Sequence, residues 1–311
     1  MTNRPSEDFF AEYQSATSGR GFLQLQDWTT ISIKGADRSS FLHNMCTNEI
    51  CKLNAGDISE AFLTDVKGKI VAHVFISVQQ EEIVLLTVPN QAEQIISHLD
   101  RYIIREDVSL NDVSEQFSWL AVFGTETSYG NAIGDDRLVL PQTLLWPQGL
   151  LVRCPNADLE KLTGELISDS TKQVSPDVWQ ALRVESGMSL FSVDFDNSNL
   201  PQEIDRNPQA INFNKGCYLG QETIARLDAL GHVNKKIVGL QFADQNVPKP
   251  GTNLYDIEKE VGTITSASWS PQLDAPLAMA MVRRSSNELG KKLKTSSGEA
   301  TVVSFPGAPR A

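Results

Sequence analysis

The strongest constraint on the fold is a change of pattern at Lys235-Lys236. Beyond this point, short runs of β-branched and apolar residues alternate with intervals that contain glycine and proline. The runs span residues 237–242, 252–255, 261–266, 277–282 and 301–305. Short strands separated by such turn residues are typical of a small all-β barrel or sandwich. We therefore expect a C-terminal β-barrel in residues 235–311 and a separate region in residues 1–234.

The region before the barrel has a different pattern, in which strand-like and helix-like segments alternate. The predicted strands are residues 29–34, 57–64, 69–78, 83–88, 119–123 and 150–154, with a polar, glycine-bearing connection between the last two. The predicted helices are a short one after Asp37, then residues 90–104, 176–186 and 221–230, and residues 194–209 are expected to form a polar loop. This order indicates a compact α+β fold.

The charge and the cysteine content narrow the classes of function. Lys and Arg total 27 and Asp and Glu total 39, so the formal net charge is −12. Such an acidic surface repels phosphate groups, and we expect no direct nucleic-acid partner and no membrane partner. The 4 cysteines are too scattered for a disulfide framework, and the first twenty residues lack the apolar core of a signal peptide. We therefore expect a cytoplasmic protein.

The most informative segment is KGCYLGQE, residues Lys215–Glu222. Its cysteine, Cys217, lies between two glycines and just before a predicted helix. The N–H groups at the helix start and the ammonium of Lys215 favour a thiolate, whereas the carboxylate of Glu222 opposes it. These features predict a moderately activated thiol. The alternative is a buried structural cysteine at a tight turn, which is the commoner role of a lone cysteine.

A second candidate is Glu185, in the helix predicted at residues 176–186. Val178, Ala181, Leu182 and Glu185 have the spacing of one helix face, so the carboxylate falls on the apolar stripe. It also lies in the last turn, where the helix dipole disfavours an anion. A buried carboxylate of this kind can accept N–H donors from a heterocyclic ligand. The alternative, an internal salt bridge, remains open at this stage.

The sequence predicts no metal site. Cys46 and Cys51 are separated by a loop, and His43 nearby does not complete a recognisable set of ligands. His73 lies on a predicted strand, where a histidine is more often packed or exposed than bound to a metal. We therefore expect no metal ligand among these residues.

The segment Lys215–Glu222, continued through Thr223-Ile224-Ala225-Arg226, closely resembles the signature of the YgfZ family of folate-binding proteins. That family is related to the T-protein (aminomethyltransferase) of the glycine cleavage system. Leu182-Arg183-Val184-Glu185-Ser186-Gly187 is similar to the helix end of the family, and Gly262–Ala267 is similar to a turn and strand of its barrel. The resemblance extends from about residue 28 to residue 305.

The resemblance implies a T-protein-like fold, in which interleaved α+β subdomains form a central channel for tetrahydrofolate or a one-carbon derivative of it, followed by a β-barrel. It implies that Glu185 contacts the pterin ring and that Arg226 faces the folate or the cysteine loop. It also implies that Cys217 and Lys215 are required for the chemistry. The implied role is support of iron–sulfur enzymes, including those that thiomethylate tRNA, with these client proteins as partners.

One departure from the T-protein bears on activity. The T-protein has paired aspartates on the strand after the glycine turn, where an ungapped reading of this chain gives Ala72-His73. Glycine cleavage is therefore not the expected reaction. Three hypotheses remain: a folate-binding factor that assembles, maintains or repairs iron–sulfur proteins, a folate-dependent one-carbon transferase or oxidoreductase that uses Cys217, and a non-catalytic scaffold.

Overall fold

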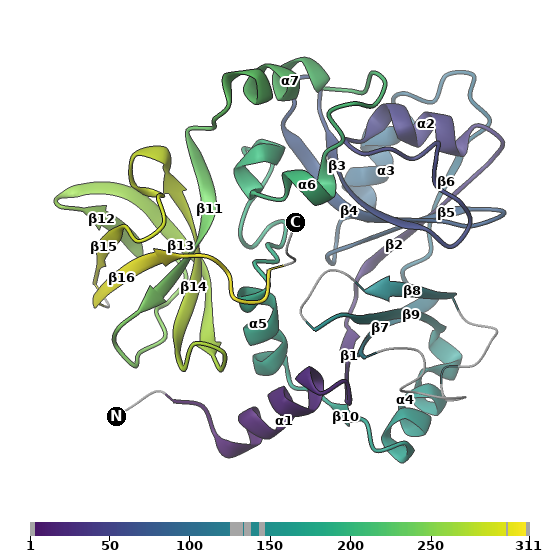
Figure 1. The fold of residues 1–311 in the computed structure, drawn as a ribbon. Helices are drawn as coiled ribbons and strands as arrows, with labels where there is room; N and C mark the ends of the chain where they lie inside the picture. The colour runs from purple at the N-terminus through teal and green to yellow at the C-terminus, as the bar shows by residue number, and fades with distance from the viewer. Residues whose placement is uncertain (1–3, 125–132, 134–137, 143–146, 297, 309–311) are drawn as a thin grey trace.

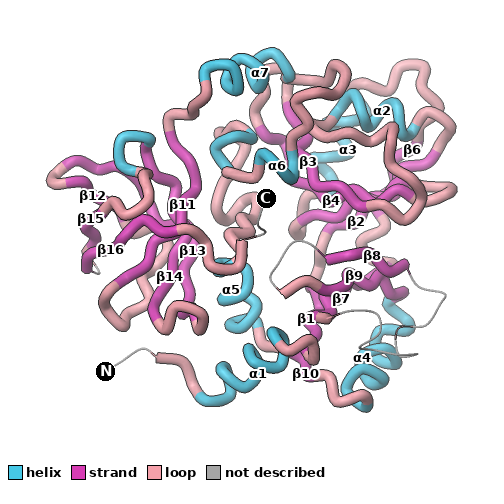
Figure 2. The backbone as a smooth tube through the Cα atoms, in the orientation of Figure 1, coloured by secondary structure: helices cyan, strands magenta, loops and turns pink. Residues whose placement is uncertain are grey.

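The computed structural model describes residues 4–124, 133, 138–142, 147–296 and 298–308. Within these residues the strands form two five-stranded sheets and a closed six-stranded barrel (Figure 1). Figure 2 shows the barrel strands as a separate group on one side and the two sheets on the other, with helices between and around them.

The first sheet has the strand order β3-β4-β5-β2-β6. Its strands are β2 (Thr29–Lys34), β3 (Ile58–Thr64), β4 (Ile70–Val78), β5 (Ile83–Thr87) and β6 (Ser109–Asp112), and its helices are α2 (Arg38–Met45) and α3 (Ala92–Asp100). Ile31 and Ile33, which alternate along β2, pack in one core cluster with residues of both helices. The helix expected from residue 90 begins two residues later, because Asn90 has a φ of 63° and cannot be helical.

The second sheet has the strand order β10-β1-β7-β9-β8. Its elements are β1 (Gly21–Leu25), β7 (Phe117–Phe123), β8 (Leu138–Gln142), β9 (Gly149–Pro155), η2 (Asn156–Asp158), α4 (Leu159–Ser168) and β10 (Lys172–Gln173). The consecutive strands β1 and β2 belong to different sheets, so the two subdomains are interleaved, as expected. Much of the connection predicted between residues 123 and 150 lies outside the described residues, and β8 is a described part of it.

The barrel has the order β11-β14-β13-β12-β15-β16 and is closed by pairing between β16 and β11. Its elements are β11 (Lys235–Phe242), β12 (Asn253–Asp256), β13 (Lys259–Ser270), β14 (Ala275–Arg283), η4 (Arg284–Ser286), β15 (Lys292–Thr295) and β16 (Gly298–Val303). The predicted strands overlap every strand of the barrel except β15. That strand was missed because Leu293 is its one apolar residue and gives no alternating pattern.

Helix α5 (Pro176–Glu185) lies between the barrel and the two sheets (Figure 1). It starts after Ser175 and gives way to Gly187, whose φ is 64°, so the predicted start and stop are confirmed. One core cluster contains residues of α5, of both sheets and of helix α1 (Glu7–Thr17). The guanidinium of Arg183 in α5 is buried, pairs with Asp194 at 2.6 Å and donates to Ser266 of β13 at 2.6 Å.

One prediction for this part of the chain needs correction. Residues 194–209 are not a plain loop, since they contain η3 (Pro201–Ile204) and α6 (Asn207–Ala210). Each short helix has a proline in its first turn, where proline is tolerated, although prolines in a polar segment suggested a loop. Helix α1 was not predicted at all, whereas α7 (Gln221–Leu230) begins and ends as expected.

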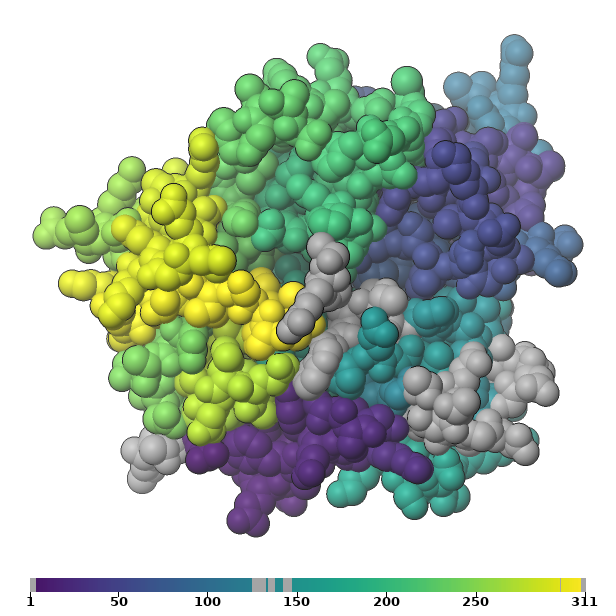
Figure 3. All heavy atoms as spheres, in the orientation of Figure 1, coloured from purple at the N-terminus to yellow at the C-terminus, as the bar shows by residue number. Residues whose placement is uncertain are grey.

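In the space-filling view, α1 lies against the barrel along one edge of the molecule (Figure 3). Just before α1, Arg4 forms an exposed ion pair with Asp274 in the β13–β14 turn, at 3.0 Å. The residues around α1 therefore contact the barrel as well as the second sheet. None of the helices in the described ranges has the length and apolar character required to cross a bilayer.

Candidate functional site

The loop formed by residues 215–220 is fixed to the end of α2 by Lys215. This lysine is buried, and its Nζ donates hydrogen bonds to the carbonyl oxygens of His43, Cys46 and Asn48 at 2.5, 2.8 and 2.6 Å. Carbonyl groups at a helix end lack intrahelical partners and carry partial negative charge, which suits an ammonium. Burial lowers the pKa of Lys215, and the three carbonyls replace its lost hydration. Lys215 therefore anchors the loop.

The other fixed point of the loop is Gly220. Its φ is 82°, and a Cβ atom there would lie 2.4 Å from the carbonyl oxygen of Asp65 and 2.8 Å from the Cα of Gly68. Only glycine accommodates both the conformation and the close approach. Next to it, the N–H of Leu219 donates to the carbonyl oxygen of Asn44 at 3.0 Å. The loop is thus held between α2 and the β3–β4 turn.

Cys217 lies between these two anchors and is exposed. Its neighbour Tyr218 is buried in a core cluster, and the Tyr218 ring lies 5.1 Å from the Nζ of Lys215. The backbone therefore directs Tyr218 inward and leaves Cys217 at the surface. This position excludes the alternative that Cys217 is a buried structural residue.

Glu185 is completely buried, and both of its carboxylate oxygens accept hydrogen bonds from the chain itself. Oε1 accepts from Ser270 Oγ at 2.5 Å and from the Gln272 N–H at 3.1 Å. Oε2 accepts from Tyr13 Oη–H at 2.6 Å and from Gln272 Nε2 at 3.2 Å. Burial and the Glu185 charge raise the pKa of Tyr13, so the phenol keeps its proton and remains a donor. Among the described residues, Glu185 is therefore in no salt bridge, and a ligand can reach it only through an exchange of donors.

To bind Glu185, a ligand would need to replace only one of these four hydrogen-bond donors. Gln272 is an exposed residue in the turn between β13 and β14, and its Nε2 makes the longest of the four hydrogen bonds. Replacing it sacrifices one hydrogen bond to a charged acceptor, worth about 1.5–3 kcal/mol, and an N–H donor of a ligand would restore a bond of the same kind. Glu185 can therefore accept an N–H donor of a heterocycle in place of Gln272 Nε2.

Sequence reasoning missed the three residues that donate to Glu185. Ser270 and Gln272 are 85 and 87 residues away along the chain, and no local pattern relates them to a helix end. For Tyr13 the sequence did contain a signal of burial on a helix, because Phe9, Tyr13 and Ala16 have helical spacing. All three are buried in α1.

Models of known protein families match both the N-terminal and the C-terminal part of the chain. The model of the glycine cleavage T-protein C-terminal barrel domain matches residues 235–306, and that of the GCVT N-terminal domain matches residues 5–128. The tRNA-modifying protein YgfZ of Sodalis glossinidius is 26% identical over 79% of this chain and 80% of its own length. The aminomethyltransferase of Listeria monocytogenes is 21% identical over 91% of this chain and 84% of its own.

A solved structure agrees with these matches. The glycine cleavage system aminomethyltransferase T from Bartonella henselae has a TM-score of 0.83 to this chain and 18% sequence identity, covering 96% of this chain and 89% of that one. The chain is a YgfZ/T-protein-like protein. The predicted T-protein-like α+β fold with a C-terminal barrel is confirmed. A putative chloroplastic transferase of Arabidopsis thaliana is also similar, with 27% identity over 91% of this chain and 69% of its own length.

In this YgfZ/T-protein-like protein, His73, which the ungapped reading places opposite a T-protein aspartate, belongs to a closed, charge-paired cluster. His73 is buried, and its Nε2 lies 2.8 Å from Glu60 Oε1. Arg206 donates to both carboxylate oxygens of Glu60. Although burial opposes it, Arg206 holds the pKa of Glu60 down at about 2. The Glu60 carboxylate in contact with His73 is therefore ionised, and both of its oxygens already accept hydrogen bonds from Arg206. A carboxylate exposed to substrate would lack such a partner.

The two residues predicted to bind the cofactor lie on separate helices of the YgfZ/T-protein-like fold. Glu185 is buried at the end of α5, whereas Arg226 is exposed on α7, the helix that follows the cysteine loop (Figure 1). Arg226 thus lies on the helix directly after the loop and apart from the buried carboxylate. Its contact with folate stays a prediction.

Proposed function

We propose that this chain is a tetrahydrofolate-binding factor of the YgfZ type. In this proposal it supports the assembly, maintenance or repair of iron–sulfur enzymes, including those that modify tRNA. Cys217 supplies the functional thiol and Lys215 positions it. The role follows that of relatives named tRNA-modifying protein YgfZ, and the four free cysteines accord with a reducing, cytoplasmic setting.

The observation that carries the proposal is the contrast between the fixed loop and its exposed thiol. Lys215 and Gly220 are both held by backbone groups, while Cys217 between them is exposed. A thiol on a restrained loop reaches a partner protein without the entropy loss that ordering a mobile loop would bring. A single thiolate cannot hold an iron–sulfur cluster alone, so a client protein would supply the other ligands.

For the folate, the proposal relies on Glu185. A reduced folate supplies a carrier of one-carbon units when it is bound. The chain's own residues would orient it: Glu185 would accept N–H donors of the pterin, and Tyr13 would keep its 2.6 Å hydrogen bond to the same carboxylate. Gln272 would be the displaced donor. The buried setting of Glu185 makes these hydrogen bonds stronger than they would be in water.

The cysteine is tested in a strain whose own copy is deleted. Cys217→Ser and Cys217→Ala are expressed in that strain, and tRNA thiomethylation is measured by mass spectrometry of nucleosides. We expect both variants to fail to restore the modification although immunoblots show wild-type protein levels. Full restoration by either variant would refute the role of the thiol.

The folate is tested by calorimetric titration of the purified chain with tetrahydrofolate. We expect dissociation constants on the order of micromolar for the wild type, with binding lost in Glu185→Ala. Gln272→Ala is the matched variant: it removes a competing donor and should bind at least as tightly as the wild type. If the wild type does not bind tetrahydrofolate, the folate drops out of the proposal. If Glu185→Ala binds it as tightly as the wild type, the folate site does not include Glu185.

A further inference from the structure

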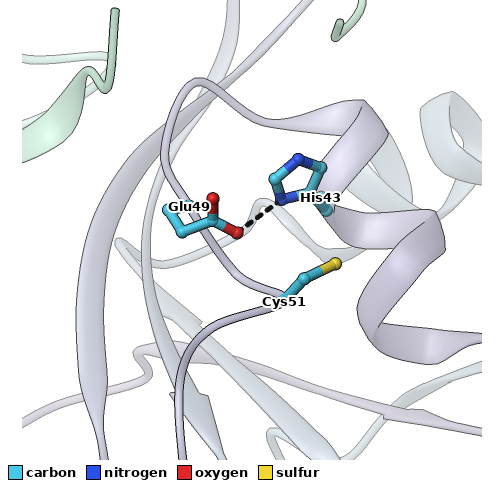
Figure 4. A group of neighbouring side chains, drawn as sticks. All are labelled: His43, Glu49 and Cys51. Carbon is cyan, nitrogen blue, oxygen red and sulfur yellow. Dashed lines mark ion pairs between the residues drawn. The ribbon is translucent and has the colours of Figure 1, made fainter. Parts of the chain in front are cut away.

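Three potential metal ligands meet beside the cysteine loop, at the end of α2. They are His43 in the last turn of α2, then Glu49 and Cys51 in the segment that follows (Figure 4). One donor atom from each lies within 4.8 Å of the other two. Sequence spacing did not reveal this group, because it drew attention to Cys46, whose side chain is buried in the core, and not to Glu49.

Nδ1 of His43 and Oε1 of Glu49 face each other at short distance. His43 Nδ1 accepts a long hydrogen bond of 3.4 Å from the N–H of Ile50, which requires an unprotonated nitrogen. Glu49 Oε1 lies 3.0 Å from the same Nδ1, and this buried oxygen accepts no hydrogen bond within the part of the chain that the structure describes. Two electron-pair donors facing each other at this distance repel unless a proton or a metal ion lies between them.

The charges of the three side chains suit a metal. An imidazole, a carboxylate and a thiolate together carry a charge of about −2, which balances a divalent cation. The Lys215 ammonium opposes the cation, but its three N–H groups are directed at carbonyl oxygens.

We propose that His43, Glu49 and Cys51 form a binding site for a divalent transition metal, with Zn²⁺ as the best match. Nitrogen, oxygen and sulfur ligands are those that Zn²⁺ takes, and three protein ligands leave a fourth position open. In a tetrahedral zinc site with bonds of about 2.0–2.3 Å, ligand atoms lie roughly 3.3–3.8 Å apart, so the three donors need to close by at most about 1.5 Å. Metal binding replaces the thiol proton of Cys51, which is released to solvent.

The imidazole ring of His43 lies next to the functional loop. A Cβ atom built on Gly216 would be 3.6 Å from His43 Nε2, so the backbone beside Cys217 passes close to the imidazole ring. Lys215 is bonded to the carbonyl oxygen of His43 as well. A metal here would fix the end of α2, to which the cysteine loop is bound. The proposal goes beyond the proposed function, which requires no resident metal.

The test is a Co²⁺ and Zn²⁺ titration of the full chain after dialysis against a chelator. We expect one equivalent of Co²⁺ to give thiolate-to-metal charge-transfer absorption, and Zn²⁺ to abolish it by competition. Cys51→Ser should remove this absorption and weaken Zn²⁺ binding at least tenfold in competition with a chromophoric chelator. Because Cys51 is exposed, this variant should fold normally, which circular dichroism checks.

Three further variants distinguish this site from metal binding elsewhere on the chain. Glu49→Gln should also weaken Zn²⁺ binding at least tenfold, while His232→Gln, which removes an exposed histidine at the end of α7, should leave it unchanged. Cys217→Ser should keep the charge-transfer absorption. Absence of stoichiometric binding would overturn the proposal. So would a Co²⁺ signal that survives in Cys51→Ser and disappears in Cys217→Ser, since this would assign the metal to the exposed loop.

Discussion

The hydroxyl of Tyr13 in α1 donates a 2.6 Å hydrogen bond to the carboxylate of Glu185 in α5, 172 residues further along the chain. Both side chains are buried, and Glu185 is completely inaccessible. The N-terminal helix is therefore part of the environment of the carboxylate that we expect to recognise a pterin, in addition to covering the second sheet.

Replacing Tyr13 with phenylalanine should destabilise the protein without changing its shape. A hydrogen bond to a charged acceptor contributes about 1.5–3 kcal/mol, and the variant leaves one acceptor site of a buried carboxylate unfilled. We expect urea unfolding to give a free energy lower by this amount. The control is Tyr102→Phe, since within the described residues the Tyr102 hydroxyl makes no hydrogen bond and its removal should cost less than about 0.5 kcal/mol. Equal effects of the two changes would contradict the importance of the Tyr13 contact.

Gly220→Ala should damage the cysteine loop. The positive φ and the approach of the Asp65 carbonyl to within 2.4 Å of a built Cβ oppose any side chain there. We expect a loss of about 1–3 kcal/mol of stability, measured by thermal unfolding. Gly164→Ala in α4 is the matched control: nothing lies within 4 Å of its built Cβ, so it should be neutral or stabilise by up to about 1 kcal/mol. A harmless Gly220→Ala would mean that the loop is not held as described.

The Glu60–Arg206 pair should make the fold sensitive to acid. The folded-state pKa of Glu60, about 2, lies below the ordinary value of 4.5, so its contribution to stability is complete above the ordinary value and is lost as the pH falls towards 2. A shift of this size corresponds to about 3 kcal/mol. Glu60→Gln should be less stable at neutral pH, because it leaves the Arg206 charge buried and unpaired.

The acid response can be measured by comparing the two proteins. The fall in unfolding free energy between about pH 5 and about pH 2.5 should be smaller in Glu60→Gln than in the wild type, by up to about 3 kcal/mol. Other carboxylates contribute equally to both. Parallel pH profiles for the two proteins would show that Glu60 does not titrate in this range.

Alkylation should distinguish the four thiols. Cys51 and Cys217 are exposed, whereas Cys46 and Cys154 are buried. Brief iodoacetamide treatment of the native protein should therefore label the first two, and the other two should react only after unfolding. Peptide mass spectrometry reads out each site. Labelling of Cys46 in the native state would indicate that the end of α2 opens.

The sequence predicted the barrel and most strands of the first sheet, because their apolar residues alternate and their turns contain glycine or proline. It also predicted the ends of α5 from Ser175-Pro176 and Gly187, since caps act locally. It failed for β15, where one leucine stands between lysines, and for residues 194–209, where short helices are held by tertiary contacts. Propensity alone does not specify helices of one turn.

The candidate site was predictable only in part. The glycines and the cysteine of the loop are local signals, and Glu185 was noticed because it lies on an apolar helix face. Its partners Tyr13 and Gln272 come from distant segments that only the fold brings together. The same holds for Lys215, which was expected to act on the thiol electrostatically but in the structure binds carbonyl oxygens of another segment.

The buried guanidinium of Arg183 binds Asp194 and reaches Ser266 of the barrel from α5. This contact crosses the junction between the barrel and the two sheets, so the barrel lacks the freedom of a hinged lobe. Ligand entry should then involve side chains and short turns, such as the turn of Gln272, rather than closure of rigid bodies. Small-angle scattering should give the same radius of gyration with and without tetrahydrofolate, whereas Arg183→Ala should release the barrel and enlarge the particle.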